Sequence, residues 1–447
     1  MKLSRRNFFA ATGAGLVARA VNAADLSKMT VRSPRPEDLE MPLDGFHEWI
    51  TPVDRFFVRC HTYLPEPANL SDWSLKLDGV VNQPLTLTMA DLRKFPRVEM
   101  VAVLECAGNG RSFYQPHVAG TQWEFGSVGN GRWAGVRFRD VLAKAGLKDS
   151  AKEILLDGSD MPLGTMPKFQ RTITLKKALH PDTLLVYEMN GAPLPAEHGF
   201  PLRLMAPGWA GDSWVKWLRH IEVLDHEFDG FWMKTAYRHP PNHVEPGATV
   251  DPAAMIPVTD LNVKSVIASP TRSPVKPGAV RISGTAWSNG SPITRVDVSV
   301  DGGSTWKQAN LFKDKSQYGW RLWELYWKAE YGKHTLMSRA TNAAGQTQPL
   351  VEEWNPNGYL WNVAQRVEIF VYAGGMGEAA PAPPPPPPPP GYDSACLTCH
   401  DESMMVQQHL TPAQWDREVN KMTGWGAKMT PGQREAILKY LSDSFKQ

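Results

Sequence analysis

An unbroken run of prolines, residues 383–390, restricts the fold of this chain more than any other feature. Proline lacks a backbone N–H and fixes φ, so the run cannot lie inside a helix or a central strand. We expect polyproline II, which rises about 3.1 Å per residue, and a span of roughly 30 Å at most. Residues 376–391 are therefore predicted to link a large body to a short C-terminal segment, residues 392–447.

The C-terminal segment carries Cys396, Cys399 and His400 in the spacing C-x-x-C-H. This is the attachment pattern of c-type haem, in which both thiols form thioethers and the histidine binds the iron. The alternatives are a zinc half-site, which needs a second pair of ligands, and a dithiol redox pair, which needs a thioredoxin-like context. The motif has neither, so the segment is predicted to hold one covalent haem c.

Two helices are expected after this motif, over residues 412–422 and 431–445, so the segment is predicted to be all-α. A methionine sulfur would complete the ligands of the iron. Met422 is favoured because it ends the first helix and faces a loop that contains glycines. Met429 is the alternative.

The N-terminus is predicted to be an export signal. Arg5 and Arg6 begin a twin-arginine pattern, a weakly apolar stretch follows over residues 10–20, and small residues suited to cleavage end at residue 23. The alternative is a chance arginine pair in an ordinary signal peptide. Because the twin-arginine route exports folded proteins, often with a cofactor, residues 1–23 predict a periplasmic protein. No later stretch is apolar enough to span a membrane.

Size and charge narrow the class of protein further. A chain of 447 residues is too long for one ordinary core, so two or three domains are expected. A net charge of +2 argues against nucleic acid or an anionic membrane surface as a partner. Of the four cysteines, only the C-x-x-C pair shares a motif, so the chain is no disulfide scaffold.

The sequence pattern of the large body, residues 24–375, changes near residue 250. Residues 24–250 mix short strands with short helices, among them a helix expected over residues 139–145. Alternation of apolar and polar residues over 280–282 and 296–300 predicts a small antiparallel sandwich within residues 251–375. Such a sandwich is expected to be structural or to contact another subunit.

One cysteine of the body lies in a setting suited to a metal. Residues 100–104 are expected to form a buried strand, and the chain then enters the glycine-rich stretch 105–111, which contains Cys106 and Arg111. A thiolate at a strand end is a soft ligand for a transition metal, and an arginine offers a planar fork to an oxyanion. The alternative is that Cys106 is a small buried hydrophobe.

Two cationic residues occur earlier in the body. Arg59 and His61 alternate with apolar neighbours, so in a strand they would share one face. This face is either a solvated edge or an anion site.

A second cationic group follows later. A strand is expected over residues 197–204, flanked by His198 and Arg203, and a glycine-rich loop follows at 207–211. With Arg203 and Lys216 nearby, this loop suits a phosphate or pyrophosphate. It lacks the spacing of a Walker loop or a dinucleotide fingerprint.

Together these motifs resemble the sulfite oxidase family of molybdenum enzymes, in which residues 57–61, 105–111, 198–203 and 214–217 find counterparts in the same order. The resemblance covers about residues 56–372, and the C-terminal segment resembles short class I cytochrome c modules. It implies an α+β sulfite-oxidase-like molybdopterin domain, an all-β immunoglobulin-like dimerisation domain and a small all-α cytochrome c domain. It also implies a homodimer.

The resemblance implies roles for particular residues. Cys106 corresponds to the protein thiolate that binds molybdenum. The positions that hold the pterin and its phosphate are Phe57, Arg59, His61, Asp160, His198, Arg203 and Lys216. The substrate pocket corresponds to Arg59, Arg111, Trp123 and Tyr237. The family often has a further substrate arginine where this chain has Asn357, a departure that leaves room for a modified substrate.

The function implied is oxidation of sulfite, or a related small sulfur oxyanion, with electrons leaving through the haem to a soluble cytochrome c. A second hypothesis is a sulfane dehydrogenase of a thiosulfate-oxidising system, which acts on sulfur bound to a carrier protein. A third is a reductase of S-oxides, against which the sandwich and the haem motif argue. The non-enzymatic alternative is a secreted haem electron carrier.

Overall fold

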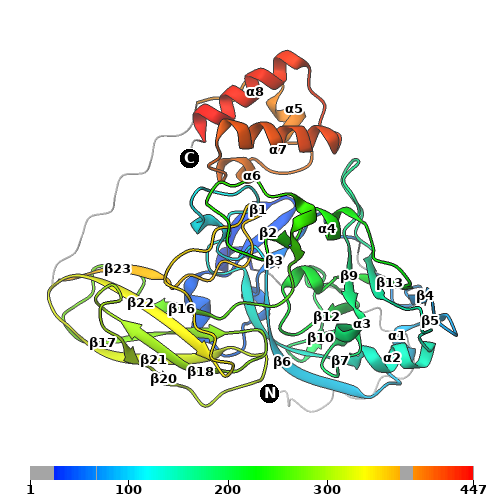
Figure 1. The fold of residues 1–447 in the computed structure, drawn as a ribbon, viewed down its shortest axis with the longest axis horizontal. Helices are drawn as coiled ribbons and strands as arrows, with labels where there is room; N and C mark the ends of the chain where they lie inside the picture. Colours follow the sequence, from blue (N-terminus) through cyan, green and yellow to red (C-terminus); the bar gives the residue numbers. More distant parts are fainter. Residues whose placement is uncertain (1–24, 67, 373–385, 446–447) are drawn as a thin grey trace, which may run out of the picture.

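The computed structural model describes residues 25–66, 68–372 and 386–445 (Figure 1). The predicted export signal, residues 1–23, and most of the predicted linker lie outside these ranges. Within them, none of the helices has the length and apolar character needed to cross a membrane. The four cysteines are not joined by disulfides.

Two five-stranded sheets form the first domain, at the lower right of Figure 1. One sheet consists of β6 (Arg97–Glu105), β7 (Val128–Arg137), β10 (Leu184–Met189), β11 (Ala192–Pro193) and β12 (Arg203–Met205). The other consists of β4 (Leu75–Gly79), β5 (Leu85–Leu87), β8 (Glu153–Gly158), β9 (Gln170–Thr174) and β13 (Leu218–Leu224). Because apolar side chains from both sheets share one core, the two sheets form a single folding unit.

Three short helices connect these strands, α1 (Met89–Leu92), α2 (Phe138–Ala145) and α3 (Leu175–Ala178), and a fourth, α4 (Phe231–Lys234), follows β13. The helix expected over residues 139–145 is confirmed as α2. It ends at Gly146, whose φ of 69° is a conformation that glycine adopts without steric cost.

Two expected strands are shorter than predicted. Of residues 197–204, only the part within β12 is a strand, because residues 195–201 form turns closed by backbone bonds such as His198 N–H to Pro195 O at 3.2 Å. Likewise β3 (Val58–Arg59) ends before His61. It pairs with β2 (Glu37–Glu40), which pairs with β1 (Thr30–Pro34). At residues 195–201 turn hydrogen bonds replace the strand pairing that the alternation predicted, whereas after β3 the Cys60 N–H still donates to Glu37 O of β2 at 3.1 Å before the pairing stops.

The expected sandwich is confirmed at the lower left of Figure 1. One sheet contains β16 (Lys264–Ser269), β17 (Gly278–Trp287), β21 (Arg321–Ala329) and β20 (Asn310–Leu311). The other contains β19 (Lys307–Gln308), β18 (Ile293–Ser299), β22 (Gly332–Asn342) and β23 (Arg366–Val371). The inward-facing side chains of both sheets form one apolar core.

A separate aromatic core joins the sandwich to the first domain. Phe46 stacks on Trp287 with ring centroids 6.3 Å apart, and it packs on Trp320 at 5.6 Å. Val103, on the strand that leads to Cys106, belongs to the same core. The sandwich is therefore packed directly behind that strand.

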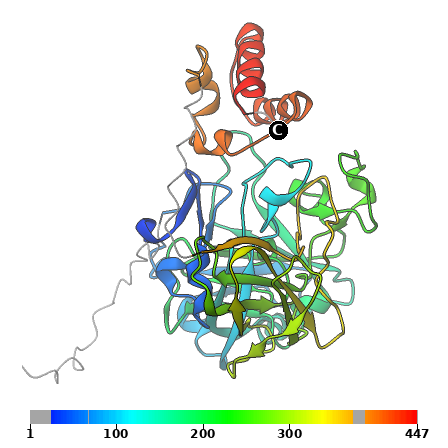
Figure 2. The same ribbon diagram turned by 90° about the vertical axis from the view of Figure 1, so that its left-hand side faces the viewer.

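The C-terminal helical module, residues 392–445, contains α5 (Tyr392–Cys396), α6 (Ser403–Val406), α7 (Pro412–Gly424) and α8 (Pro431–Ser444). The two helices expected there are present, and each begins with a capping box, formed by Thr411 with Gln414 in α7. The module lies on the first domain, with α6 next to β1 (Figure 1, Figure 2).

Candidate active site

The chain turns sharply after β6, and this turn presents Cys106. Asn109 N–H donates to Cys106 O at 3.0 Å, and the Asn109 side-chain oxygen accepts from Ser127 N at 3.3 Å. Gly110 has a φ of 92°, and a Cβ there would lie 2.6 Å from Trp361. The backbone at this turn is therefore fixed by its own loop and by a residue far along the chain.

A buried ion pair braces the same turn from the sandwich. Lys264 Nζ donates to Glu105 Oε1 at 2.5 Å and to Asn109 O at 3.2 Å, and Trp287 Nε1 donates to Glu105 Oε2 at 2.7 Å. Lys264 and Glu105 are both buried. No sequence pattern marked Lys264, because its only signal is a pairing with a residue in another domain.

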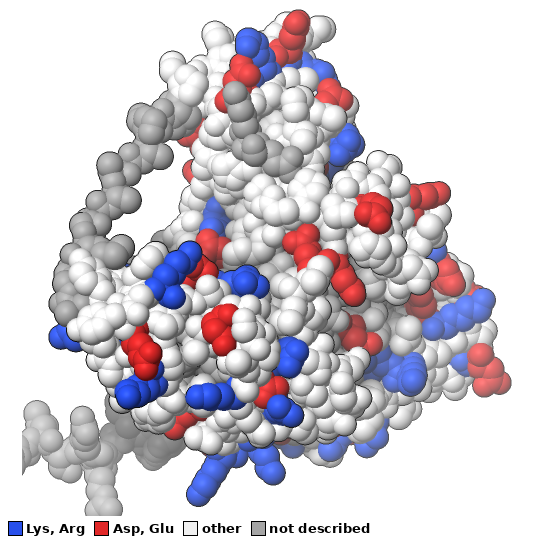
Figure 3. Space-filling model, turned by 60° about the vertical axis from the view of Figure 1, so that its left-hand side comes forward, with Lys and Arg blue, Asp and Glu red and all other residues white. Residues whose placement is uncertain are grey.

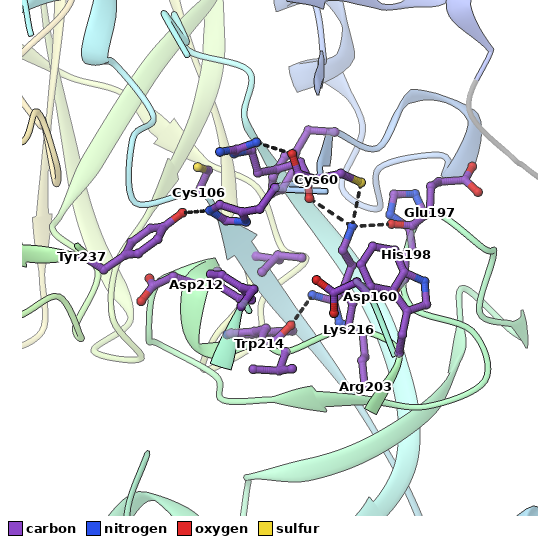
Figure 4. Close-up of a pocket in the computed structure, with 18 residues that line it drawn as sticks. Cys60, Cys106, Asp160, Glu197, His198, Arg203, Asp212, Trp214, Lys216 and Tyr237 are labelled. Atoms are coloured by element: carbon purple, nitrogen blue, oxygen red, sulfur yellow. Dashed lines mark hydrogen bonds between the residues drawn. The ribbon is translucent and has the colours of Figure 1, made fainter. Parts of the chain in front are cut away.

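An inner pocket runs from Cys106 into the first domain (Figure 4). Cys106 and Tyr237 lie at one end of it, and Asp160, His198, Arg203 and Lys216 lie at the other. The structure thus brings together most of the residues predicted from sequence, since those that line this pocket are Phe57, Arg59, His61, Cys106, Asp160, His198, Arg203, Lys216 and Tyr237.

Arg203 is a buried cation without a counter-ion among the residues that the structure describes. Its guanidinium donates to His198 O at 2.9 Å and to Trp214 O at 3.0 Å, and it packs on the Trp133 ring. Burial lowers the pKa of Arg203 to about 9, and its Nε has no hydrogen-bond partner. A buried charge left in this state favours an anionic ligand.

Two neighbours of Arg203 add to this polar end. Lys216 Nζ donates to Glu197 O at 2.8 Å and to Arg59 O at 3.0 Å. Burial, with Lys216 and Arg203 nearby, lowers the pKa of His198 well below its ordinary value, and His198 Nε2 has no partner. This end therefore offers positive charge and an unused ring nitrogen, which fit a phosphate joined to a hydrogen-bonding heterocycle.

Arg59 is held by an acidic residue that sequence reasoning missed. Its Nη1 lies 3.0 Å from Oδ1 of the fully buried Asp38, and it also donates to Cys60 O. Burial opposes the charge of Arg59, but Asp38 outweighs it and raises the pKa of Arg59. Arg59 therefore remains a fixed cation at the Cys106 end of the pocket.

Tyr237 and His61 form a pair beside Cys106. The Tyr237 hydroxyl lies 2.7 Å from His61 Nε2, and the His61 ring stacks on Phe169 with centroids 4.3 Å apart. Burial lowers the pKa of His61 and raises that of Tyr237, so both groups are neutral at pH 7. Tyr237 also has a φ of 52°, which is unusual for a bulky residue and occurs where a side chain must be aimed.

A larger cavity of about 600 Å³ opens from Cys106 toward the helical module. At the Cys106 end it is lined by Arg59, Arg111 and Tyr237. Arg111 Nη1 donates to Thr121 O at 3.1 Å, and its guanidinium lies 5.1 Å from the Tyr359 ring centroid. Arg111 thus faces this cavity with no carboxylate within ion-pair distance among the described residues.

The far wall of this larger cavity belongs to the helical module. Cys396, Cys399 and His400, the residues of the C-x-x-C-H motif, line it together. Met422 and Met429 also line it, as do Met404 and Met405. The choice of Met422 over Met429 as iron ligand stays a prediction.

One position near the site differs from the sequence-based expectation, one was not expected, and a third, Asn357, lies near the substrate arginines as the resemblance implied. Trp123 is fully buried and is not among the residues lining either cavity. Tyr359, which sequence reasoning missed, stacks on Tyr237 with centroids 5.1 Å apart. Asn357 lines the larger cavity, where its side chain donates to Arg238 O at 2.8 Å and its own carbonyl lies 3.5 Å from Arg111 Nη2.

Both large domains of this chain match known protein families, in the order in which they occur here. Residues 61–232 match the family described as an oxidoreductase molybdopterin binding domain, and residues 255–372 match a Mo-co oxidoreductase dimerisation domain. The chain is 37% identical to the sulfite oxidase of Gallus gallus over 351 residues, which cover 74% of this chain and 76% of that protein. It is 32% identical to the sulfite oxidase of Arabidopsis thaliana over 361 residues, covering 74% of this chain and 91% of that protein.

The human mitochondrial sulfite oxidase is 37% identical over 364 residues, which cover 77% of this chain but only 66% of that enzyme. Among solved structures, the sulfane dehydrogenase SoxCD from Paracoccus pantotrophus has a TM-score of 0.67 at 29% identity, covering 76% of this chain and 88% of that one. These findings define the class as oxidoreductases with a molybdopterin binding domain. Within it, the chain belongs to the sulfite oxidase family.

Proposed function

We propose that this protein oxidises sulfite to sulfate at a molybdenum–pterin centre and passes the electrons through its own haem c to an external cytochrome c. The balanced half-reaction is SO₃²⁻ + H₂O → SO₄²⁻ + 2 H⁺ + 2 e⁻. The observation that carries the proposal is the larger cavity, which joins Cys106, Arg59 and Arg111 to the C-x-x-C-H motif. One continuous cavity thus connects a candidate metal thiolate, a candidate oxyanion site and a candidate electron acceptor.

The residues of the inner pocket fit a molybdenum–pterin group. Cys106 would bind the metal, and Arg203, Lys216 and His198 would hold the pterin phosphate and ring, since they include a cation without a counter-ion and a nitrogen without a partner. Asp160, Phe57 and His61 line the same pocket and complete the proposed pterin site. When bound, the group supplies two-electron oxygen transfer to sulfur.

The chain itself would bind and orient the substrate. Arg59 lines both the inner pocket and the larger cavity, Arg111 lines the larger cavity, and both would donate hydrogen bonds to the sulfite oxygens from their guanidinium forks. The neutral Tyr237 hydroxyl would hold a hydrogen bond next to the reacting oxygen, positioned by His61. Tyr237 is buried and the Arg59 side chain is only 25% exposed, so these interactions act with limited competition from water.

The proposed route of electrons ends at the C-terminal helical module. Cys396 and Cys399 would bind haem c covalently, and His400 and Met422 would bind its iron. Covalent haem c is attached outside the cytoplasm, which agrees with the twin-arginine pattern and a periplasmic location.

Charges of both signs are mixed on the face in Figure 3, so no broad basic field for nucleic acid is present there. The dimerisation domain supports a homodimer.

The test uses full-length protein exported in a host that makes both cofactors. We expect molybdenum and iron in equal amounts, and reduction of the haem absorbance bands on addition of sulfite. Cys106→Ser protein serves as the control, since it should retain haem that sulfite no longer reduces. Iron without molybdenum would instead support the non-enzymatic haem carrier.

A second candidate function is sulfane dehydrogenase activity on sulfur bound to a carrier protein. Asn357 favours it, because no third arginine side chain stands at this position to enclose a small free anion. The structural likeness to SoxCD gives further support. Haem reduction only after addition of a thiolated carrier protein, and not by free sulfite, would select this function.

A further inference from the structure

A short irregular segment, residues 117–122, connects the helical module to the body, and we call it the clamp segment. Gln408 binds both backbone groups of Gly120, donating to its oxygen at 3.0 Å and accepting from its nitrogen at 3.2 Å. Gln407 accepts from Gln122 N at 2.8 Å. Gln408 is only 6% exposed, so these hydrogen bonds are shielded from water.

The opposite side of the clamp segment contacts the two proposed substrate arginines. Thr121 O accepts from Arg111 Nη1 at 3.1 Å, and a Cβ on Gly120 would lie 2.9 Å from the same nitrogen. Thr121 Oγ1 donates at 2.8 Å to Asp38, the carboxylate that pairs with Arg59. The clamp segment therefore touches Arg111 directly and Arg59 through one carboxylate.

We propose that docking of the helical module through Gln407 and Gln408 fixes the clamp segment and thereby positions Arg111 and Arg59 for oxyanion binding. The inference rests on the proposed function only in that these arginines bind the oxyanion. Gly120 has a φ of 123°, and without Gln408 its oxygen is still held by Gln122 Nε2 at 2.7 Å, within the clamp segment itself. Loss of Gln408 therefore releases Gly120 from the helical module, and as a glycine it can adopt other backbone conformations. Affinity for the oxyanion would then be high only while the electron-accepting module is docked.

Gln408→Leu tests this inference, because leucine keeps the bulk and removes both hydrogen bonds to Gly120. With ferricyanide as acceptor, we expect the KM for sulfite to rise about five- to tenfold, the effect of losing one or two buried hydrogen bonds. The kcat should stay within about twofold, since no group that touches the reacting atoms changes. Lys439→Ala, on the exposed face of α8, is the matched control and should change neither constant.

A double-mutant cycle separates positioning from general loosening of the protein. Because Gln408 is proposed to act on both arginines, Gln408→Leu should have a smaller effect on oxyanion affinity in an Arg111→Ala background, where only the path through Asp38 to Arg59 remains. Additive effects, or a KM for Gln408→Leu within twofold of wild type, would overturn the inference. If Gln408→Leu does not accumulate as folded protein, Gln407→Leu takes its place with the same expectations.

Binding of sulfate, measured by calorimetry on the same holoproteins, separates this inference from the proposed function. A five- to tenfold weaker sulfate affinity in Gln408→Leu supports the inference even if sulfite is not oxidised by the wild type. Equal sulfate affinities in both proteins refute it even if sulfite is oxidised. Absence of sulfate binding by the wild type refutes both, because the arginines would then not form an oxyanion site.

Discussion

Lys264 Nζ lies 2.5 Å from Glu105 Oε1, and this contact joins the sandwich to the residue next to Cys106. Both side chains are buried, and Trp287 of the sandwich donates to the other carboxylate oxygen. The sandwich therefore holds the turn that presents the candidate metal ligand. This agrees with the structural role expected for the sandwich and adds the particular contact through which it acts.

Lys264→Met should destabilise the protein because it leaves the Glu105 carboxylate buried without its cation. We expect the free energy of unfolding to fall by about 3–5 kcal/mol, as in other buried pairs that lose one partner. Urea unfolding would measure this loss. The double variant Lys264→Met/Glu105→Gln should recover part of it, and no recovery would indicate that Lys264 acts by packing alone.

Cys106→Ser should abolish sulfite oxidation while leaving the haem spectrum unchanged. We expect turnover to fall by more than about a hundredfold, since even residues that merely support a metal ligand cost about 10- to 100-fold when removed. Steady-state rates and the molybdenum content of the purified protein would be measured together. Near-full activity in this variant would make Cys106 a packing residue.

Arg59→Ala and Arg111→Ala should both weaken substrate affinity but should differ in stability. Losing one charged hydrogen-bonding group should raise the KM for sulfite by about 10- to 100-fold in each case. Only Arg59→Ala leaves a buried carboxylate, Asp38, without its cation, so this variant should also unfold at lower urea concentration. An unchanged KM for either variant would remove that arginine from the substrate site.

Arg203→Met should have opposite effects on cofactor content and on the stability of the cofactor-free protein. Molybdenum content should fall, because the proposed phosphate partner is lost. In protein made by a host that cannot synthesise the pterin, the free energy of unfolding should rise by about 1–4 kcal/mol, since an unpaired buried charge is replaced by an apolar side chain. Arg203→Lys keeps the charge and should not show this gain.

Acid should destabilise the protein in part through His198. Its folded-state pKa is well below the ordinary value of 6.5, so the unfolded chain binds more protons below pH 6.5. The stability due to the neutral ring is complete above pH 6.5 and is lost by about 1.4 kcal/mol per pH unit below it. Urea unfolding between pH 5 and 8 should show that the free energy of unfolding falls less steeply with decreasing pH for His198→Gln than for wild type. Equal slopes would indicate that His198 is protonated when folded.

The elements that could be predicted from sequence are those with a strong local signal. The alternation in the sandwich, Gly146 at the end of α2, and the helices α7 and α8 all follow from short patterns and were confirmed. The strand expected over residues 197–204 failed because Gly199 and Pro201, with Pro195 just before them, allow turns that use the same apolar pattern. Hydrophobic alternation alone does not distinguish these outcomes.

In the candidate site too, the residues with a strong local sequence signal could be predicted and the others could not. Cys106, the C-x-x-C-H motif and the cations at Arg59, Arg203 and Lys216 could be found from the sequence, because spacing and residue type carry their chemistry. Trp123 was expected in the pocket but is buried elsewhere, since the sequence does not fix which way a loop residue points.

By itself, then, the sequence determined which candidate groups this protein offers to a metal, an anion and a haem. Only the tertiary structure decided that Asp38 pairs with Arg59, that Lys264 reaches Glu105, and that Gln408 binds the segment behind Arg111. Each of these contacts joins residues distant in the chain, and each depends on burial, which removes water as a competing partner. No local pattern carries that information.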